Sequence, residues 1–157
     1  MTIPSTVRSF LEDKQVPFDR TVHTPSITAD EAAEAAHVSG DKVAKAVVLR
    51  DEAGVLLAVL PASHVLHVLE LGKLMGRDLR LAEEGEFRSL FPDCEPGAVP
   101  AVGPAYGLET VVSDALADAD EIWFEAGDHV TLLHVSGEDF RRLLSGATLA
   151  GMSSHRH

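Results

Sequence analysis

The sequence predicts an α/β protein of the α+β type, in which a mixed and mainly antiparallel β-sheet, or a partly closed barrel, is flanked by helices. Segments with helical apolar spacing are interspersed with segments rich in β-branched residues, which predicts both element types along the chain. A hairpin signal lies on each side of a Pro/Gly-rich stretch, so part of the sheet is antiparallel. With 157 residues, 45% of them apolar, the chain suits one compact domain.

The first forty residues predict two helices with one strand between them. Apolar residues fall at helical spacing over residues 5–15, and Val16-Pro17 ends that helix. A short strand is expected over residues 18–23. Thr28 and Glu31 have the spacing of a capping box, which predicts the start of a second helix, and Gly40 is placed to end it.

The following fifty residues predict a hairpin and several smaller elements. Residues 43–50 and 55–60 are mainly apolar and contain several β-branched valines, which predicts two strands joined by a short polar turn. Ser63 is placed to cap a third helix that runs to Met75. A short strand over residues 79–81 and a short helix over residues 83–91 complete this part.

After the Pro/Gly-rich stretch, the sequence predicts three strands and a last helix. The strands are expected over residues 109–113, 121–126 and 130–135, with Gly127-Asp128 as the hairpin signal between the last two. Ser136 is placed to cap a helix that runs to Leu144. We assign residues 1–146 to one domain and expect the small, polar residues 147–157 to form a frayed, flexible tail.

The composition excludes several classes of function. A net charge of −12 argues against a protein that grips DNA or other long nucleic acid through many phosphates, although it allows contact with one nucleic-acid end. The chain has one cysteine, no apolar stretch approaching about eighteen residues and no signal-peptide pattern. We therefore expect a cytoplasmic protein without an internal disulfide or a membrane segment.

The Pro/Gly-rich stretch, residues 93–104, is the first candidate binding element. Three prolines and two glycines in twelve residues suit neither a helix nor a central strand. The apolar residues of this loop indicate that it packs on the body of the protein. Its backbone N–H and C=O groups would then be held in place and available to a ligand.

Lys45 is the second candidate. It lies in the apolar strand, and if it shares a face with Val43 and Val47, its ammonium group needs an anionic partner. The alternative is that Lys45 lies on the outward face or reaches solvent at the strand end. Spacing alone does not decide between these two positions.

Other residues carry weaker signals. His64, His67 and Glu70 recur every three residues, which is also typical of the solvated face of a helix, and we favour that interpretation over a metal site. The C-terminal histidines are assigned to the frayed end rather than to a metal. Cys94 could act as a nucleophile with His23 or His129, but no cysteine-hydrolase signature surrounds it. No phosphate-loop, dinucleotide or nucleophile-elbow motif is present, so no cofactor and no metal are expected.

Four features carry a resemblance to a known family. They are Lys45 before Ala46-Val47-Val48-Leu49, the strand end Val59-Leu60-Pro61-Ala62, the Asp93–Pro100 run through Gly103, and Ala126-Gly127-Asp128-His129 before the last strand. In these features the chain, from about Ser5 to Leu144, resembles the YbaK/prolyl-tRNA-synthetase-associated family of trans-editing domains. The loop and the lysine together are fairly specific, whereas each alone is weak.

The resemblance implies an aminoacyl-tRNA deacylase, which hydrolyses the ester of a mischarged tRNA in trans. It implies that Lys45 lies near the tRNA end. It also implies that a Gly-x-x-x-Pro loop, which begins at Gly97, binds the aminoacyl group through its backbone. The family's proline falls on Ala101 in this sequence, one place after Pro100. The residues expected to bind substrate are Ala98, Val99, Pro100, Ala101 and, from a hairpin that lines the pocket in relatives, His129.

Elementary chemistry gives reasons for these roles. Backbone N–H groups of Gly97 and Ala98 would stabilise the oxyanion of ester hydrolysis, with water as the nucleophile. Cationic Lys45 would pair with the terminal phosphate or polarise the ester, and Lys42 and Arg50 are expected to join it in a local cationic patch. The small side chains of the loop favour a small amino acid, in the order alanine, serine, threonine.

The expected partner is the 3′ acceptor end of a mischarged tRNA, and an aminoacyl-tRNA synthetase could deliver it. The protein itself is expected to be a monomer or a weak homodimer. Two alternatives remain open at this point. One is a non-catalytic module that binds an aminoacyl or nucleotide ligand with the same fold, and the other is a hydrolase that depends on Cys94.

Overall fold

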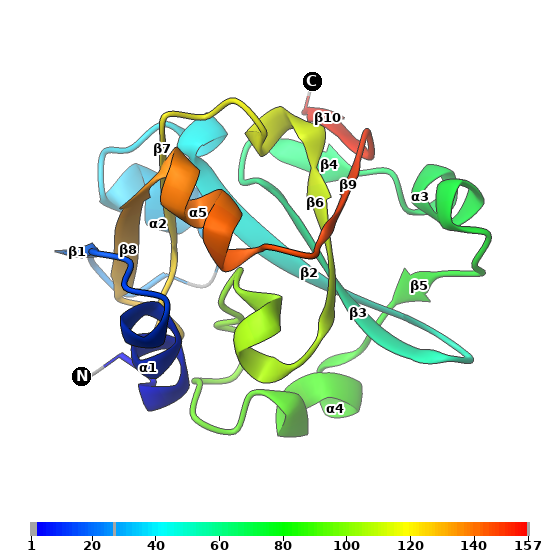
Figure 1. The fold of residues 1–157 in the computed structure, drawn as a ribbon, viewed down its shortest axis with the longest axis horizontal. Helices are drawn as coiled ribbons and strands as arrows, with labels where there is room; N and C mark the ends of the chain where they lie inside the picture. The colour runs from blue at the N-terminus through cyan, green and yellow to red at the C-terminus, as the bar shows by residue number, and fades with distance from the viewer. Residues whose placement is uncertain (1–2, 27, 157) are drawn as a thin grey trace.

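The computed structural model describes residues 3–26 and 28–156, and the centre of the fold is a sheet of eight strands (Figure 1). These strands are β1 (Asp19–Val22), β2 (Val43–Asp51), β3 (Gly54–Pro61), β5 (Arg80–Leu81), β6 (Glu109–Ser113), β7 (Glu121–Glu125), β8 (Thr131–Ser136) and β9 (Thr148–Ala150). A second, two-stranded sheet pairs β4 (His64–Leu66) with β10 (Ser153–His155).

The main sheet is mixed, as predicted. Its strands follow the order β1-β8-β7-β2-β3-β6-β9, and β5 pairs with the end of β2. Pairing is antiparallel for β1·β8, β7·β8, β2·β3 and β2·β5, and parallel for β2·β7, β3·β6 and β6·β9. The predicted hairpins, β2–β3 and β7–β8, are both present, and they place β2, the strand of Lys45, in the middle of the sheet.

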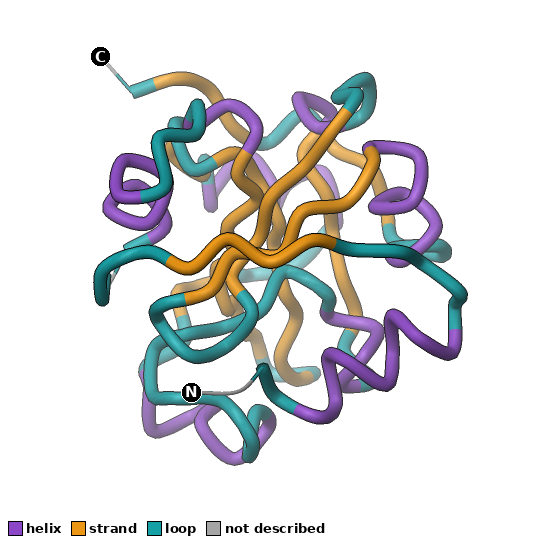
Figure 2. The backbone as a smooth tube through the Cα atoms, turned by 90° about the vertical axis from the view of Figure 1, so that its left-hand side faces the viewer, coloured by secondary structure: helices purple, strands orange, loops and turns teal. Residues whose placement is uncertain are grey.

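The helices lie around the outside of the crossing strands (Figure 2). They are α1 (Ser5–Asp13), α2 (Ala29–Ala35), α3 (Val68–Met75), α4 (Glu84–Phe87) and α5 (Gly137–Leu143). Four short 3-10 helices join them: η1 (Gly40–Lys42), η2 (Arg88–Leu90), η3 (Gly103–Tyr106) and η4 (Asp114–Leu116). None of the helices in the described ranges is long and apolar enough to span a bilayer.

Alternate residues of the strands supply separate parts of the core. Ile122 and Phe124 of β7 are fully buried in a cluster with residues of α1 and α5. The residue between them, Trp123, packs instead with Ala32 and Ala33 of α2. This period of two is the strand pattern that the sequence showed, and it explains why helices cover both faces of β7.

The second helix begins as predicted and ends differently. Thr28 Oγ1 accepts a hydrogen bond from the Glu31 N–H at 3.1 Å and donates one to the Glu31 carboxylate at 3.1 Å. The helix ends at Ala35, and His37, with a φ of 59°, takes the left-handed position expected of Gly40. Gly40 instead begins η1, so its predicted role as the helix end was wrong.

The third helix begins later than predicted. Residues 64–66 form β4 because they pair with β10, and α3 starts at Val68 with His67 as its N-cap residue. Ser63 therefore does not cap it. Local helical spacing was overridden by a strand partner about ninety residues further along the chain, which the sequence pattern could not reveal.

The C-terminal segment also differs from the frayed tail expected from the sequence. Residues 148–150 extend the main sheet beside β6, and residues 153–155 lie antiparallel to β4 (Figure 1). Met152, between these two strands, is fully buried in the cluster that includes Leu71 of α3. That buried side chain and the two pairings hold a segment whose composition alone suggested disorder.

Candidate functional site

A cavity of about 170 Å³ lies where the beginning of β2 meets the Pro/Gly-rich loop and the β7–β8 turn. It brings together five of the residues that the sequence singled out. The described lining residues are Thr28, Ala29, Ala44, Lys45, Ala46, Gly97, Ala98, Val99, Glu125 and His129. None of them is a serine or a cysteine, and the hydroxyl of Thr28 is engaged with the N–H and the carboxylate of Glu31.

Lys45 is half-buried at this cavity, and backbone oxygens hold its ammonium group. Nζ donates to the carbonyl oxygen of His64 at 2.7 Å and to that of Ala62 at 3.3 Å. Burial lowers the pKa of the ammonium, with the positive charge of Arg156 acting in the same direction and Asp30 opposing it. A lysine ammonium has three donors, so one remains for a ligand.

The Pro/Gly-rich loop reaches the cavity at Gly97, Ala98 and Val99. Gly97 has a φ of 80°, a left-handed conformation that favours glycine. Its N–H donates to Glu84 Oε1 at 3.1 Å, and the Ala98 N–H donates to the Glu95 carbonyl at 3.0 Å. The two donors expected to face an oxyanion therefore have partners within the protein. No acceptor in the described part of the chain bonds the Val99 N–H.

Pro100 and Ala101 lie behind the cavity wall rather than in it. Both are buried, and Ala101 is fully buried in the core cluster that contains Phe124 and Phe140. The Ala101 side chain therefore contributes to packing at the position where the resemblance places a proline. The structure does not bring these two residues to the lining of the cavity with the other three.

His129 lies in the β7–β8 turn and contacts the loop. Its Nε2 lies 2.6 Å from the Pro96 carbonyl oxygen, so this nitrogen donates, and the ring is close to Gly97. His129 has a φ of 65°, an uncommon backbone conformation for a residue other than glycine. The turn thus fixes the imidazole against the loop.

Glu125 holds this turn and was not singled out in the sequence. Its Oε1 accepts the N–H groups of Gly127, Asp128 and His129 at 3.0, 3.1 and 2.9 Å. Asp128 is buried, and its carboxylate accepts from the N–H groups of Val130 and Thr131 and from the Thr131 hydroxyl. The signal was available, because an acidic residue just before a Gly-Asp turn can accept the turn's exposed N–H groups.

The expected cationic patch of Lys42, Lys45 and Arg50 does not form. Lys42 pairs with Glu121 at 3.1 Å and Asp120 at 3.7 Å, and Arg50 pairs with Glu86 at 2.9 Å. Of the three, only Lys45 lines the cavity. Arg156 was not predicted to lie here. It pairs with Asp30, and its guanidinium donates at 3.1 Å to the Ala62 carbonyl oxygen, which also accepts a hydrogen bond from Lys45.

Cys94 lies outside this cavity. Burial raises the pKa of its thiol to about 11, and Sγ lies 3.3 Å from the Tyr106 hydroxyl and 3.8 Å from Asp93 Oδ1. A thiol with such a pKa is almost entirely protonated at neutral pH, and the thiolate is the nucleophilic form. These surroundings favour a structural role for Cys94.

The expected helical row of His64, His67 and Glu70 is not present. His64 is buried in β4, whereas His67 precedes α3 and lies 2.7 Å from the Ser154 hydroxyl. Glu70 alone lies within the helix. The solvated helix face predicted from this spacing was therefore wrong at its first two positions.

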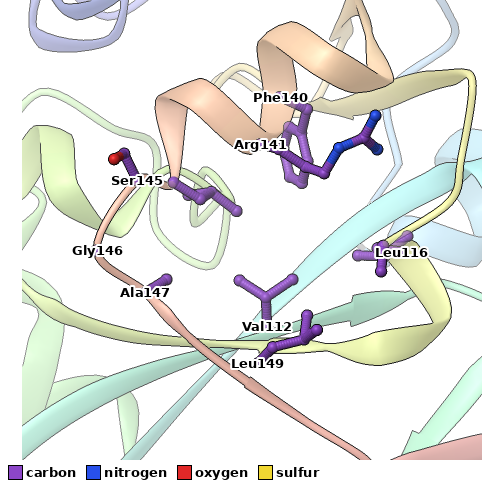
Figure 3. Close-up of a pocket in the computed structure, with 10 residues that line it drawn as sticks. Val112, Leu116, Phe140, Arg141, Ser145, Gly146, Ala147 and Leu149 are labelled. Carbon is purple, nitrogen blue, oxygen red and sulfur yellow. The ribbon is translucent and has the colours of Figure 1, made fainter.

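A larger cavity, of about 260 Å³, lies between α5, β6 and β9 (Figure 3). Side chains of Val112, Leu116, Phe140 and Leu149 line it, and Arg141 is the charged residue of its lining. It shares no lining residue with the cavity of Lys45, and its described lining includes the Ser145 hydroxyl but no histidine, carboxylate or lysine that could act as a base beside it. We therefore place the candidate chemistry in the smaller cavity.

Comparisons with known proteins identify the family of the chain. A model of the aminoacyl-tRNA editing domain family matches residues 23–143, a range that contains every described lining residue of the smaller cavity. "Proline--tRNA ligase" of Xanthomonas axonopodis pv. citri (strain 306) is 30% identical over 117 residues, and that of Xanthomonas oryzae pv. oryzae (strain MAFF 311018) is 31% identical over 117 residues. Each match covers 73% of this chain and 20% of the relative, so the chain spans about a fifth of the length of these curated relatives.

Solved structures show the same fold over almost the whole chain. A hypothetical protein, APE2540, superposes with a TM-score of 0.82 at 25% identity and covers 96% of this chain and 100% of its own. A second structure, described as "a putative trans-editing enzyme for prolyl tRNA synthetase", has a TM-score of 0.77 at 25% identity and covers 98% of this chain and 99% of its own. The chain therefore belongs to the aminoacyl-tRNA editing domain family.

Proposed function

We propose that this protein is an aminoacyl-tRNA deacylase that acts in trans on the ester between an amino acid and the 3′-terminal ribose of a mischarged tRNA. The observation that carries the proposal is the single cavity lined by Lys45, the Gly97–Val99 loop and His129. Membership of the editing-domain family supports the same chemistry.

Lys45 is the proposed cationic group of the site. Two of its three donors bond the carbonyl oxygens of His64 and Ala62, which leaves the third to meet the terminal phosphate or the ester carbonyl of the substrate. Because two neutral oxygens fix the ammonium without neutralising it, its positive charge remains available to an anion. Lys42 and Arg50 are already paired with carboxylates.

Water is the proposed nucleophile, since the described lining contains neither serine nor cysteine and its threonine, Thr28, caps α2 through bonds with Glu31. Its oxygen attacks the ester carbonyl carbon, the bond to the ribose oxygen breaks, and the proton goes to that oxygen, which gives free amino acid and uncharged tRNA. The Val99 N–H is the best candidate donor to the oxyanion, because the Gly97 and Ala98 N–H groups have protein partners. One such donor is worth about 3–4 kcal/mol of transition-state stabilisation.

The size of the cavity favours a small aminoacyl group. Its volume of about 170 Å³ is well below the roughly 300–1,000 Å³ of ordinary small-molecule sites. Alanine remains the first proposed substrate side chain, followed by serine and threonine. The relatives named as proline–tRNA ligases favour tRNA-Pro as the carrier, met in the cytosol either free or delivered by its synthetase.

The test is deacylation of a panel of mischarged tRNAs by the intact protein, with alanyl-, seryl- and threonyl-tRNA-Pro as substrates and prolyl-tRNA-Pro as the correctly charged reference. Lys45→Ala should lower the rate by about 10²-fold or more. The matched control is Lys42→Ala, three residues earlier and ion-paired on the surface, which should change the rate by no more than about twofold.

The outcomes separate the remaining alternatives. Cys94→Ala should keep its activity, and loss of activity in that variant alone would identify a cysteine-dependent hydrolase. Binding of the mischarged tRNA without deacylation above the buffer rate would identify a non-catalytic module. Full activity of Lys45→Ala would show that the lysine is not part of the machinery.

A further inference from the structure

Asp41, His64 and His155 form a cluster at the end of the molecule where the chain terminates. They come from three separate segments, η1, β4 and β10, and one potential metal-ligating atom from each lies within 4.8 Å of the other two. Asp41 and His155 are exposed, whereas His64 is buried. Sequence spacing did not predict that His64 and His155 lie together, because it grouped His64 with His67 and Glu70 instead.

The β4–β10 pairing brings the two imidazoles together. His155 lies opposite His64 in the antiparallel register, and the ring centroids are 4.4 Å apart. The segment of Asp41 is joined to β4 by the Ser63 N–H, which donates to the Gly40 carbonyl oxygen at 3.3 Å, and by the Ser63 hydroxyl, which donates to Asp41. The backbone therefore sets all three positions.

Outer hydrogen bonds orient the side chains as they do around metal ligands. His64 Nδ1 lies 2.9 Å from the Ser153 hydroxyl, which lies 2.8 Å from the Ser113 hydroxyl. This bond fixes the ring of His64 and leaves its other nitrogen for a metal. His155 Nε2 lies 2.8 Å from Asp41 Oδ1, in the position where a cation bound to both would replace the shared proton.

We propose that Asp41, His64 and His155 bind a divalent transition-metal ion, with Zn²⁺ as the best match. Two imidazole nitrogens and one carboxylate oxygen are a ligand set that zinc accepts, with water as the fourth ligand. Ligand atoms on a tetrahedral zinc lie roughly 3.3 Å apart, given metal–ligand distances of about 2.0–2.1 Å. The side chains of Asp41 and His155 are 59% and 64% exposed and can rotate by the small amount needed, while the buried His64 stays in place.

Such a metal would hold the C-terminal strand against the rim of the candidate site. Arg156 follows His155 directly, and it donates to the Ala62 carbonyl oxygen that also accepts from Lys45. The proposed metal has a structural role there, and it does not depend on the proposed deacylase activity.

The test uses the full chain, stripped with EDTA and dialysed, and titrated with Zn²⁺ in a calorimeter. One equivalent should bind, and the melting temperature should rise in the presence of Zn²⁺. His64→Gln and Asp41→Asn should each weaken binding at least tenfold. His67→Gln is the matched control, because His67 bonds Ser154 on the same strand but lies outside the cluster, and it should bind as the unchanged protein does.

A second control addresses the histidine at the chain end. His157 lies outside the described residues, and His157→Gln tests whether the terminal His-x-His sequence binds the metal by itself. The proposal is overturned if no Zn²⁺ binds, or if His64→Gln and Asp41→Asn both bind as tightly as the unchanged protein. Circular dichroism of each variant in EDTA shows whether it is folded, and the exposed Asp41 provides the decisive variant if His64→Gln does not fold.

Discussion

Lys45 combines the two arrangements that its spacing allowed: its backbone lies in the apolar strand, and its ammonium group reaches the strand end. It lies in an apolar strand, as the burial of its neighbours Val43 and Ala44 shows, yet its ammonium reaches the strand end and bonds two carbonyl oxygens. An anionic partner is therefore not required in the resting protein. The ammonium is desolvated in part, held in place and positively charged, which is the state that a site for an anionic substrate needs.

Cys94 provides the prediction at this scale. Because burial raises the pKa of its thiol to about 11, the thiolate fraction at pH 7.5 is very small, and alkylation by iodoacetamide should be far slower than that of a free cysteine. The alkylation rate of the native protein should rise with pH up to about 11. The measurement is mass spectrometry of the protein after timed exposure, with the urea-unfolded chain as the reference.

A native rate equal to that of the unfolded chain would contradict this environment for Cys94. It would also reopen the cysteine-dependent alternative, since an accessible thiolate is what such an enzyme requires.

Among the elements, α5 shows how closely the helices approach their neighbours. Ser136 accepts the Asp139 N–H at 3.0 Å, as its predicted capping role requires. Gly137 follows, and its N–H donates to the Asp120 carbonyl oxygen at 2.9 Å. A Cβ atom at position 137 would lie only 1.7 Å from the Ala119 carbonyl oxygen, so the absence of a side chain lets α5 dock on the chain before β7.

Gly137→Ala should therefore destabilise the protein by about 2 kcal/mol or more, because backbone rather than a flexible side chain must move. Gly85→Ala is the matched comparison, since a Cβ there meets nothing within 4 Å and the residue lies in α4. It should stabilise the protein by about 0.5–1 kcal/mol. Urea unfolding of both variants measures the two effects, and equal midpoints would contradict the close approach of α5.

For the whole molecule, ion pairs between distant segments link stability to pH. Arg77 donates to both carboxylate oxygens of Asp51 at 2.7 and 2.9 Å and to Glu109 at 2.8 Å. These bonds connect the β2–β3 turn, the chain after α3 and the start of β6. The hydrogen bonds from Arg77 hold the pKa of the Asp51 carboxyl at about 2.

The folded-state pKa of Asp51 lies below the value of about 4 in an unfolded chain. Its contribution to stability is therefore complete above about pH 4 and is lost as the pH falls toward 2. Asp51→Asn should be less stable than the unchanged protein at pH 7 and should lose less of its stability between pH 5 and about 2. Denaturant unfolding at several pH values measures this, and parallel curves for the two proteins would contradict it.

Much of this molecule could be predicted from the sequence because the decisive signals were local. The N-cap at Thr28, the hairpins and the Ser136 cap each depend on residues within a few positions, and the structure has all of them. The Glu31 carboxylate accepts from the Thr28 hydroxyl rather than from the Thr28 N–H, so the second half of the predicted capping box is not formed. The meeting of Lys45 with Gly97 came from a resemblance, because no local rule relates residues so far apart. Residues 64–66 were predicted to be helical, the C-terminal segment to be frayed, and Lys42 and Arg50 to form a cationic patch with Lys45. These predictions were wrong because distant strands and carboxylates determine those positions.

The pairing of β1 with β8 has a consequence for the time course of synthesis. Asp19 lies opposite His134, so the first strand of the chain has no partner until 115 further residues have been made. At about 5–20 residues per second, this delay is roughly 6–23 s. During that interval the backbone N–H and C=O groups of β1 that later bond β8 must hydrogen-bond water instead.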